Sequence, residues 1–368
     1  MNDKLYWIGF NLVRGIGPVR LQSLLDHFGS IESAWMARAG EYQSAGLNQK
    51  TIENILQIRN ELDLDAFYTR ISAEGIQVYT WADAEYPIRL KNIPHPPPVL
   101  YVRGEILADD HWTVAIVGTR RVTSYGRQVT EQVATYLARQ GVTVISGLAR
   151  GVDGIAHHTA LLQGGRTLAV LGSGVDQIYP PEHRQLAEKI MQHGAIISDY
   201  PPGTPPDAVN FPPRNRLISG LSAAVVVIEA GETSGALITA TFAAEQGKDV
   251  FAVPGGIYSP QSKGTNRLIQ QGATPLLDVR DILEQLDIRH VDQYKQASLM
   301  LPADEVESAL LKILQLEPMQ IDEIKAQSGL AVEKISAGLT MLELKGLVRQ
   351  VNGSAYQAIM EDQAEYRT

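Results

Sequence analysis

VAIVGTRRVTSYGRQVTEQVATYLARQGVTVISG, residues 114–147, is the stretch that decides the fold class. Both ends are short apolar runs that lead into a glycine, and the segment between them has the spacing of an amphipathic helix. Strands that are apolar at consecutive positions are buried on both faces, as in parallel sheets covered by helices. We therefore predict an α/β protein built from strand–helix–strand units.

The same unit recurs along the chain. Further apolar runs follow as TLAVLG (167–172), AIISD (195–199), AVVVIEA (224–230) and VFAVPGG (250–256). A spacing of about 25–30 residues between their centres is typical of successive strand–helix units, so the sheet should be mainly parallel. Ligands bind such sheets beyond the carboxyl ends of the strands, and the loops there are where we expect a site.

The flanking segments indicate additional domains. Residues 1–60 contain short helical stretches, two of them hinged at Gly15-Ile16-Gly17, and no strand signal. This hinge resembles the hairpin of helix-hairpin-helix DNA binders, although it serves equally well to pack two helices. Residues 75–105 add two strand-like pieces, which we place at the edge of a central domain spanning 61–285.

The C-terminal part is predicted to be a separate domain. Residues 286–302 lack a clear period and are predicted to be a linker. Residues 303–368 fit three helices followed by a hairpin at Asn352-Gly353, the order of a winged helix-turn-helix. Residues 304–360 carry eight acidic residues against five basic ones, so we do not expect this domain to contain the main nucleic-acid binding site.

Composition limits the classes of function. The 368 residues have a formal charge of −9 and no cysteine, which excludes a disulfide framework and thiolate metal sites. No apolar run approaches the length of a membrane span, and we expect a soluble, cytoplasmic protein. Residues 111–275 nevertheless hold 13 Lys and Arg against 11 Asp and Glu, so positive charge is concentrated in the predicted sheet domain.

Two strand-to-helix turns are candidate anion sites. At Gly118-Thr119-Arg120, open backbone amides and an arginine favour binding of a phosphate. A tight turn with solvated arginines and no ligand would have the same sequence pattern. In the turn after residue 147, Asp153 is predicted to be the N-cap of the next helix, and Arg150 is the better ligand candidate. The adjacent His157 and His158 would point about 100° apart on a helix, so we expect no metal site there.

The stretch NFPPRNRLISG, residues 210–220, is typical of single-strand binding. Pro212 and Pro213 stiffen the approach, Phe211 offers a face for base stacking, and Arg214 and Arg216 can reach phosphates. The alternative places Phe211 in the core and pairs the arginines with Glu229 or Glu232.

Nucleotide cofactors are not expected. Lys263 and Arg267, with Gly264 and Thr265 between them, could hold another phosphate or a small molecule. Gly172-Ser173-Gly174 lacks the third glycine of a dinucleotide loop, and no stretch matches the phosphate loop of ATPases.

In this order, the motifs resemble the DNA-processing protein A (DprA, or Smf) family of bacteria. The matching stretches cover most of residues 75–280 and are AIVGTRRVTSYG, VISGLARGVDGIAHHTAL, VLGSGVDQIYPPEH, NFPPRNRLISGLS, SGALITATFAAEQGKDVFAVPGG and KGTNRLIQQGA. The resemblance implies an extended Rossmann-like domain between a small helical domain, of SAM or helix-hairpin-helix type, and a winged helix. It also implies a homodimer that binds single-stranded DNA during natural transformation, protects it and loads RecA.

The resemblance places the DNA pocket around Gly118-Thr119-Arg120 and Phe211 through Arg216. Together with the candidates above, the predicted DNA-binding residues are Gly118, Thr119, Arg120, Arg121, Arg150, Phe211, Arg214, Asn215, Arg216, Lys263 and Arg267. No catalytic residue, metal or cofactor is expected. One alternative is a phosphoribohydrolase, but Asn266-Arg267 follows Gly264-Thr265 where those enzymes lead to a catalytic glutamate; the other is a structural scaffold.

Overall fold

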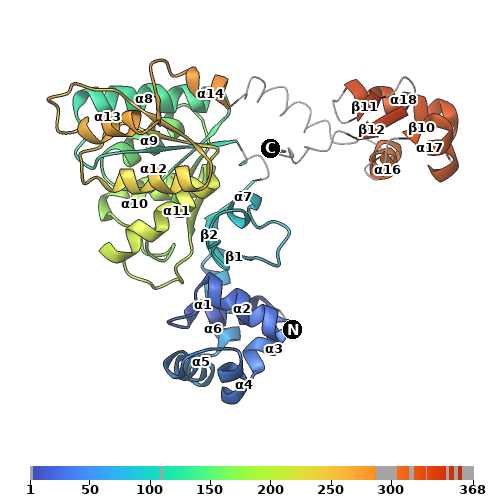
Figure 1. Ribbon diagram of the computed structural model, residues 1–368, viewed down its shortest axis with the longest axis horizontal. Coiled ribbons are helices and arrows are strands. Elements are labelled where there is room, and N and C mark those ends of the chain that lie inside the picture. Colours follow the sequence, from blue (N-terminus) through green and yellow to red (C-terminus); the bar gives the residue numbers. More distant parts are fainter. Residues whose placement is uncertain are drawn as a thin grey trace. The chain divides into compact units, whose positions relative to one another are not determined.

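The structure, a computed structural model, describes residues 3–107, 110, 112–286, 305–314, 319–328, 330–344, 348–351 and 355–358 (Figure 1). The chain divides into two compact units, Met1–Arg289 and His290–Thr368. None of the helices in the described ranges is long and apolar enough to cross a membrane.

The first unit begins with six short helices. They are α1 (Lys4–Leu12), α2 (Pro18–Phe28), α3 (Ile31–Met36), α4 (Ala39–Ser44), α5 (Gln49–Glu61) and α6 (Leu64–Ala73). The predicted hinge lies between α1 and α2, where Gly15 has a φ of 101° that glycine adopts without strain. Trp7 and Phe10 of α1 share a hydrophobic core with Tyr101 and Ile196 of the sheet. A separate helical domain at residues 1–60 therefore stays a prediction.

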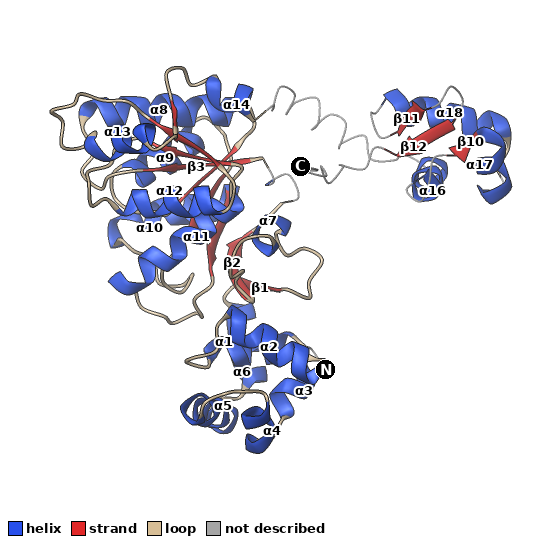
Figure 2. Ribbon diagram, viewed as in Figure 1, coloured by secondary structure: helices blue, strands red, loops and turns tan. Residues whose placement is uncertain are grey.

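A nine-stranded sheet forms the centre of this unit (Figure 2). The order is β1-β2-β6-β5-β4-β3-β7-β8-β9. The strands are β1 (Ile76–Thr80), β2 (Val99–Gly104), β3 (Thr113–Val117), β4 (Thr143–Ser146), β5 (Thr167–Val170), β6 (Gly194–Ser198), β7 (Ala224–Val227), β8 (Asp249–Ala252) and β9 (Thr274–Pro275). Strands β3 to β9 pair in parallel, and only β1 and β2 add antiparallel pairs among the described strands of this sheet. The predicted mainly parallel sheet is confirmed.

Helices cover both faces of the sheet (Figure 1). They are α7 (Ile88–Lys91), α8 (Ser124–Arg139), α9 (Val152–Leu162), α10 (Arg184–His193), α11 (Phe211–Leu221), α12 (Gly235–Glu245), α13 (Lys263–Gln270) and α14 (Asp281–Gln285), with 3₁₀ turns at Pro181–His183 and Ala208–Asn210. Helices α11 and α12 pack on the face that carries Leu168 and Val170, whereas α10 packs against Ala169. This alternation along one strand separates two cores.

The direction of strand addition reverses at β3. Ala115 of β3 lies opposite Ile145 of β4 on one side and opposite Val225 of β7 on the other. Strands β4 to β6 extend the sheet one way, and β7 to β9 extend it the other way. Such a switch point opens a crevice at the carboxyl ends of its strands, which is where this class of sheet binds ligands.

The second unit is a small helical domain with a sheet of its own. It contains α16 (Glu305–Leu314), α17 (Ile321–Ser328), α18 (Val332–Leu344), β10 (Met319–Gln320), β11 (Val348–Val351) and β12 (Ala355–Ala358). Strands β11 and β12 pair antiparallel, as predicted for a winged helix. The predicted turn at Asn352-Gly353 and nearly all of the predicted linker lie outside the described residues.

Candidate functional site

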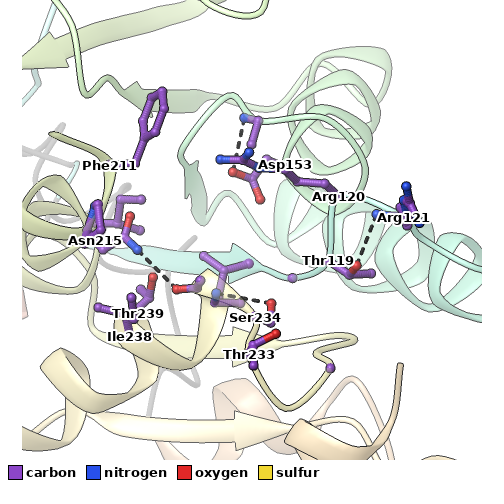
Figure 3. A pocket seen from close by; sticks show the side chains of 18 of the residues that line it. Thr119, Arg120, Arg121, Asp153, Phe211, Asn215, Thr233, Ser234, Ile238 and Thr239 are labelled. Carbon is purple, nitrogen blue, oxygen red and sulfur yellow. Dashed lines mark hydrogen bonds between the residues drawn. The ribbon is translucent and has the colours of Figure 1, made fainter. Parts of the chain in front are cut away.

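A cleft of about 970 Å³ opens at the switch point (Figure 3). Its walls come from the loops that follow β3, β4, β5, β6, β7 and β8 and from helices α9, α11, α12 and α13. Arg120 extends from the β3 loop toward Asp153 and Phe211, while Thr233 and Ser234 line another wall (Figure 3). The sequence-predicted residues in its walls are Gly118, Thr119, Arg120, Arg121, Phe211, Arg214, Asn215 and Lys263.

Glu229, two residues after the end of β7, holds the β3 loop in place. Its side chain is only 2% exposed, and it accepts hydrogen bonds from the Thr123 amide (2.9 Å) and hydroxyl (2.6 Å). Its carbonyl oxygen accepts the amide of Thr119 at 2.7 Å. Because both ends of the loop are tied to one buried residue, Arg120 and Arg121 are presented to solvent on a fixed backbone.

Gly118 lets this loop approach the next helix. A Cβ atom there would lie 2.6 Å from Val152 Cγ2, closer than real side chains pack. Thr119 adds a turn, because its hydroxyl accepts the Arg121 amide at 3.1 Å. The hydroxyl is therefore used within the loop and helps shape it.

Phe211 is surrounded by an aromatic ring and two cations. Its ring stacks on Tyr179, with centroids 5.8 Å apart and an angle of 28° between the rings. The guanidinium carbons of Arg120 and Arg214 lie 5.6 Å and 5.9 Å from its centroid. The side chain is half-buried in the cleft wall. Phe211 is therefore not a core residue, as the alternative had it.

Arg214 lies beneath this cluster and is 5% exposed. It donates to the Gly147 carbonyl at 2.9 Å, to the Val170 carbonyl, and through Nε to Asn215 Oδ1 at 3.2 Å. Burial lowers the pKa of Arg214 to about 10, and the neighbouring Asp153 carboxylate opposes that shift. The side chain thus stays cationic at neutral pH and supplies a fixed positive charge under the cleft.

Asp153 has a different role from the one predicted. The N-cap of α9 is Gly151, whereas Asp153 lies in the first turn. Its carboxylate accepts the amides of Gly147 (3.1 Å) and Ala149 (3.2 Å) from the preceding loop. Burial raises its pKa, and Arg214 counteracts that effect. The predicted N-cap was wrong because the loop before α9 folds back onto the helix.

Arg216 does not lie in the cleft. It forms an ion pair with Asp199, with Nη2 and Oδ2 2.7 Å apart, and lines a separate cavity of about 160 Å³ with Phe10 and Asn11 of α1. Helix α11 begins with Phe211, Pro212 and Pro213. The segment that we predicted to be a stiff approach to the site is therefore helical. Residues two apart on a helix point about 200° apart, which separates Arg214 from Arg216. Neither arginine pairs with Glu229 or Glu232.

The remaining predicted residues lie around the cleft. Lys263 is in its wall, 3.7 Å from the Glu232 carboxylate. Arg150 pairs with Glu182 and lines a small second cavity that shares Phe211 and Arg214 with the cleft. Arg267 is exposed on α13 outside the cleft wall.

A model of the DNA recombination-mediator protein A family matches residues 77–287. The chain belongs to that family. A model of the DprA winged helix domain matches residues 296–354. Protein Smf of Synechocystis sp. is 39% identical, with 97% of this chain and 99% of the relative covered. The DNA processing protein DprA of Bacillus subtilis is 40% identical, with 65% and 82% covered.

Two solved structures of recombination-mediator protein A relatives resemble this one. DprA from Streptococcus pneumoniae aligns with a TM-score of 0.66 and 31% identity, covering 77% of this chain and 97% of that one. DprA from Helicobacter pylori, whose structure is described as showing its single-stranded DNA binding mode, aligns with a TM-score of 0.52 and 33% identity. That alignment covers 57% of this chain and 95% of the other. The predicted family and fold are confirmed.

One wall of the cleft in this recombination-mediator protein was missed by the sequence analysis. It is the segment 231–235 with Ile238 and Thr239 of α12. Ser234 caps α12 by accepting the Ala236 amide at 3.4 Å, and Asn215 of α11 donates to the Gly235 carbonyl at 3.2 Å. The signal was present, because EAGETSGALITA repeats the order of strand, glycine-containing turn and helix found at Gly118.

Proposed function

We propose that this protein binds single-stranded DNA in the switch-point cleft. The observation that carries the proposal is the cluster of Phe211, Tyr179 and Arg120, an aromatic pair beside an exposed arginine in the wall of the cleft. Single strands are held without sequence preference by aromatic faces for the bases and cations for the backbone. The single-stranded DNA binding described for the Helicobacter pylori relative supports the same reading.

The cleft residues have different roles in this proposal. Arg120 and Arg121 are exposed and can pair with phosphates, while the buried Arg214 contributes charge from below without leaving its carbonyl partners. A base stacks against the Phe211–Tyr179 pair once the exposed guanidinium of Arg120 moves from the ring to a phosphate. The amino terminus of α12 favours negative charge on the opposite wall.

The biological role that we propose follows the family. As a recombination mediator, the protein protects single strands taken up during natural transformation and loads RecA onto them as a homodimer, in the cytoplasm. The family match and the DprA relatives support this role. We propose binding without catalysis, and incubation with nucleoside monophosphates should release no free base.

Fluorescence anisotropy with a labelled strand of about 20 nucleotides tests the binding. We expect little dependence on base sequence and much weaker binding to a blunt duplex of equal length, because a duplex hides its base faces. Arg120→Ala should reduce the slope of log K against log salt by about 0.7, the value for one lost phosphate contact. Arg139→Ala, an exposed arginine at the end of α8, is the matched control. Equal slopes for both variants would place the site elsewhere.

A further inference from the structure

The turn between β8 and α13 carries two exposed apolar side chains at its tip. Tyr258 is 91% exposed and Ile257 is 73% exposed. Tyr258 is the most exposed large apolar side chain among the described residues. The turn is closed by a hydrogen bond from the Ser259 amide to the Gly256 carbonyl at 2.9 Å, which puts these two residues at its corner. Single exposed apolar residues are common, but adjacent ones at a turn tip need an explanation.

The base of the turn is rigidly held. The Asn266 side chain donates to the Gly255 carbonyl at 3.0 Å and accepts the Gly255 amide at 3.2 Å. The Tyr125 hydroxyl donates to the Pro254 carbonyl at 2.9 Å, and the Ala230 amide donates to the Gln261 carbonyl at 2.8 Å. These bonds fix the backbone at the base of the turn, so that little besides the two side-chain torsions of Tyr258 has to be ordered when it binds a flat ligand.

The turn adjoins the cleft. Pro260, Gln261 and Lys263, which follow it directly, line the cleft wall. Arg267 lies one helical turn beyond Lys263 on α13 and forms no ion pair with any residue that the structure describes. A strand that leaves the cleft along this wall would therefore pass an aromatic face and then a free cation.

We propose that Tyr258 is a second nucleobase subsite. A base of the bound strand stacks on its ring outside the cleft, and Arg267 pairs with a phosphate of the same segment. This inference rests on the proposed single-strand binding and extends its footprint beyond the cleft. A nucleic acid is the occupant that the charges favour, because Lys263 and Arg267 follow the turn on α13.

A length series of oligothymidylates tests the subsite. For a strand of about 20 nucleotides, Tyr258→Ala should bind roughly tenfold more weakly than the wild type, equally at low and high salt. For a strand of about 5 nucleotides, which fills only the cleft, the two proteins should bind alike. Tyr258→Phe should retain full affinity at both lengths, and Leu162→Ala, an exposed apolar residue on α9, is the control. Equal affinity of Tyr258→Ala and wild type for the long strand would overturn the proposal.

A second readout keeps this inference separable from the cleft. In Tyr258→Trp, the fluorescence of the introduced indole should be quenched by the long strand, whereas in Leu162→Trp it should not change. Unquenched fluorescence of the Tyr258→Trp protein, when that protein binds the strand, contradicts the subsite. Failure of the cleft proposal would instead appear as Phe211→Ala binding every length like the wild type.

Discussion

Arg214 and Arg216 lie two positions apart on helix α11 and face different cavities. Arg214 supplies charge beneath the cleft, while Arg216 pairs with Asp199 next to helix α1. The helix therefore gives one arginine to the candidate site and the other to the contact between the N-terminal helices and the sheet. Replacing each arginine should therefore affect a different property of the protein.

Arg216→Met should lower stability and leave DNA binding unchanged. The substitution leaves the Asp199 carboxylate largely buried without its partner, and breaking such a pair costs about 3 kcal/mol in the free energy of unfolding. Urea denaturation measures this loss. Anisotropy at a temperature where the variant is folded should give wild-type affinity and salt slope. An affinity loss in the folded variant would return Arg216 to the binding site.

Glu229→Gln should weaken binding through the β3 loop. The amide group of glutamine cannot accept both Thr123 hydrogen bonds, and an unsatisfied buried group costs about 1–3 kcal/mol. We expect reduced stability and reduced single-strand affinity, because Arg120 is no longer fixed. Thr123→Ser keeps the hydroxyl donor and serves as the control, with wild-type behaviour in both assays. Full affinity of Glu229→Gln would show that the loop needs no such anchor.

Mild acid should destabilise the protein through His157. Burial lowers the pKa of this histidine to about 3, whereas the unfolded chain titrates near 6.5. Below pH 6.5 the unfolded state binds more protons, so the stability present at pH 7 is lost as the pH falls toward 3, with about 2 kcal/mol lost by pH 5. The Thr167 hydroxyl donates to the Val144 carbonyl, so its oxygen is left to accept the Nδ1–H of His157 at 2.7 Å. The Nε2 atom is buried without a hydrogen-bond partner among the described residues, so a second proton there would be unpaired.

Denaturation of wild type and His157→Asn at about pH 7 and about pH 5 measures this contribution. Asparagine can keep a donor toward Thr167 but does not titrate, so the variant should lose less stability between the two pH values. The same loss in both proteins would assign the acid sensitivity to other groups.

Truncation after residue 286 should leave the affinity for single-stranded DNA within about threefold of the full-length protein. This limit corresponds to about 0.7 kcal/mol in binding free energy. The winged helix carries more acidic than basic residues, and helix α18 contains no arginine. Binding of the folded truncated protein to the same labelled strand checks this, with its circular dichroism and oligomeric state as controls. A hundredfold loss would make the winged helix part of the binding site.

Much of the fold could be predicted because its strands are short apolar runs that need no context. Each of the six runs between residues 114 and 256 overlaps one strand of the sheet. The glycine turns after them also predicted the cleft, since parallel strands end at one edge. The winged helix was predicted from three segments with helical periodicity and the Asn352-Gly353 turn dipeptide.

Tertiary context decided what the sequence left open. Two prolines after Phe211 suggested an extended approach, but proline is also favoured in the first turn of a helix, and that is where Pro212 lies. The helical period then sends Arg216 away from the cleft. Asp153 looked like a helix cap, but its partners are amides of the loop before the helix. Which groups a carboxylate meets depends on loop folding that no local pattern encodes.

Binding of a labelled single strand by Phe211→Ala, at low and high salt, is the most direct test of the cleft as the DNA site. The account predicts a loss of about 1–3 kcal/mol that is nearly the same at both salt concentrations, because stacking rather than charge is removed. Thermal denaturation establishes that the variant is folded. Wild-type affinity in a folded Phe211→Ala protein would contradict the assignment of the cleft.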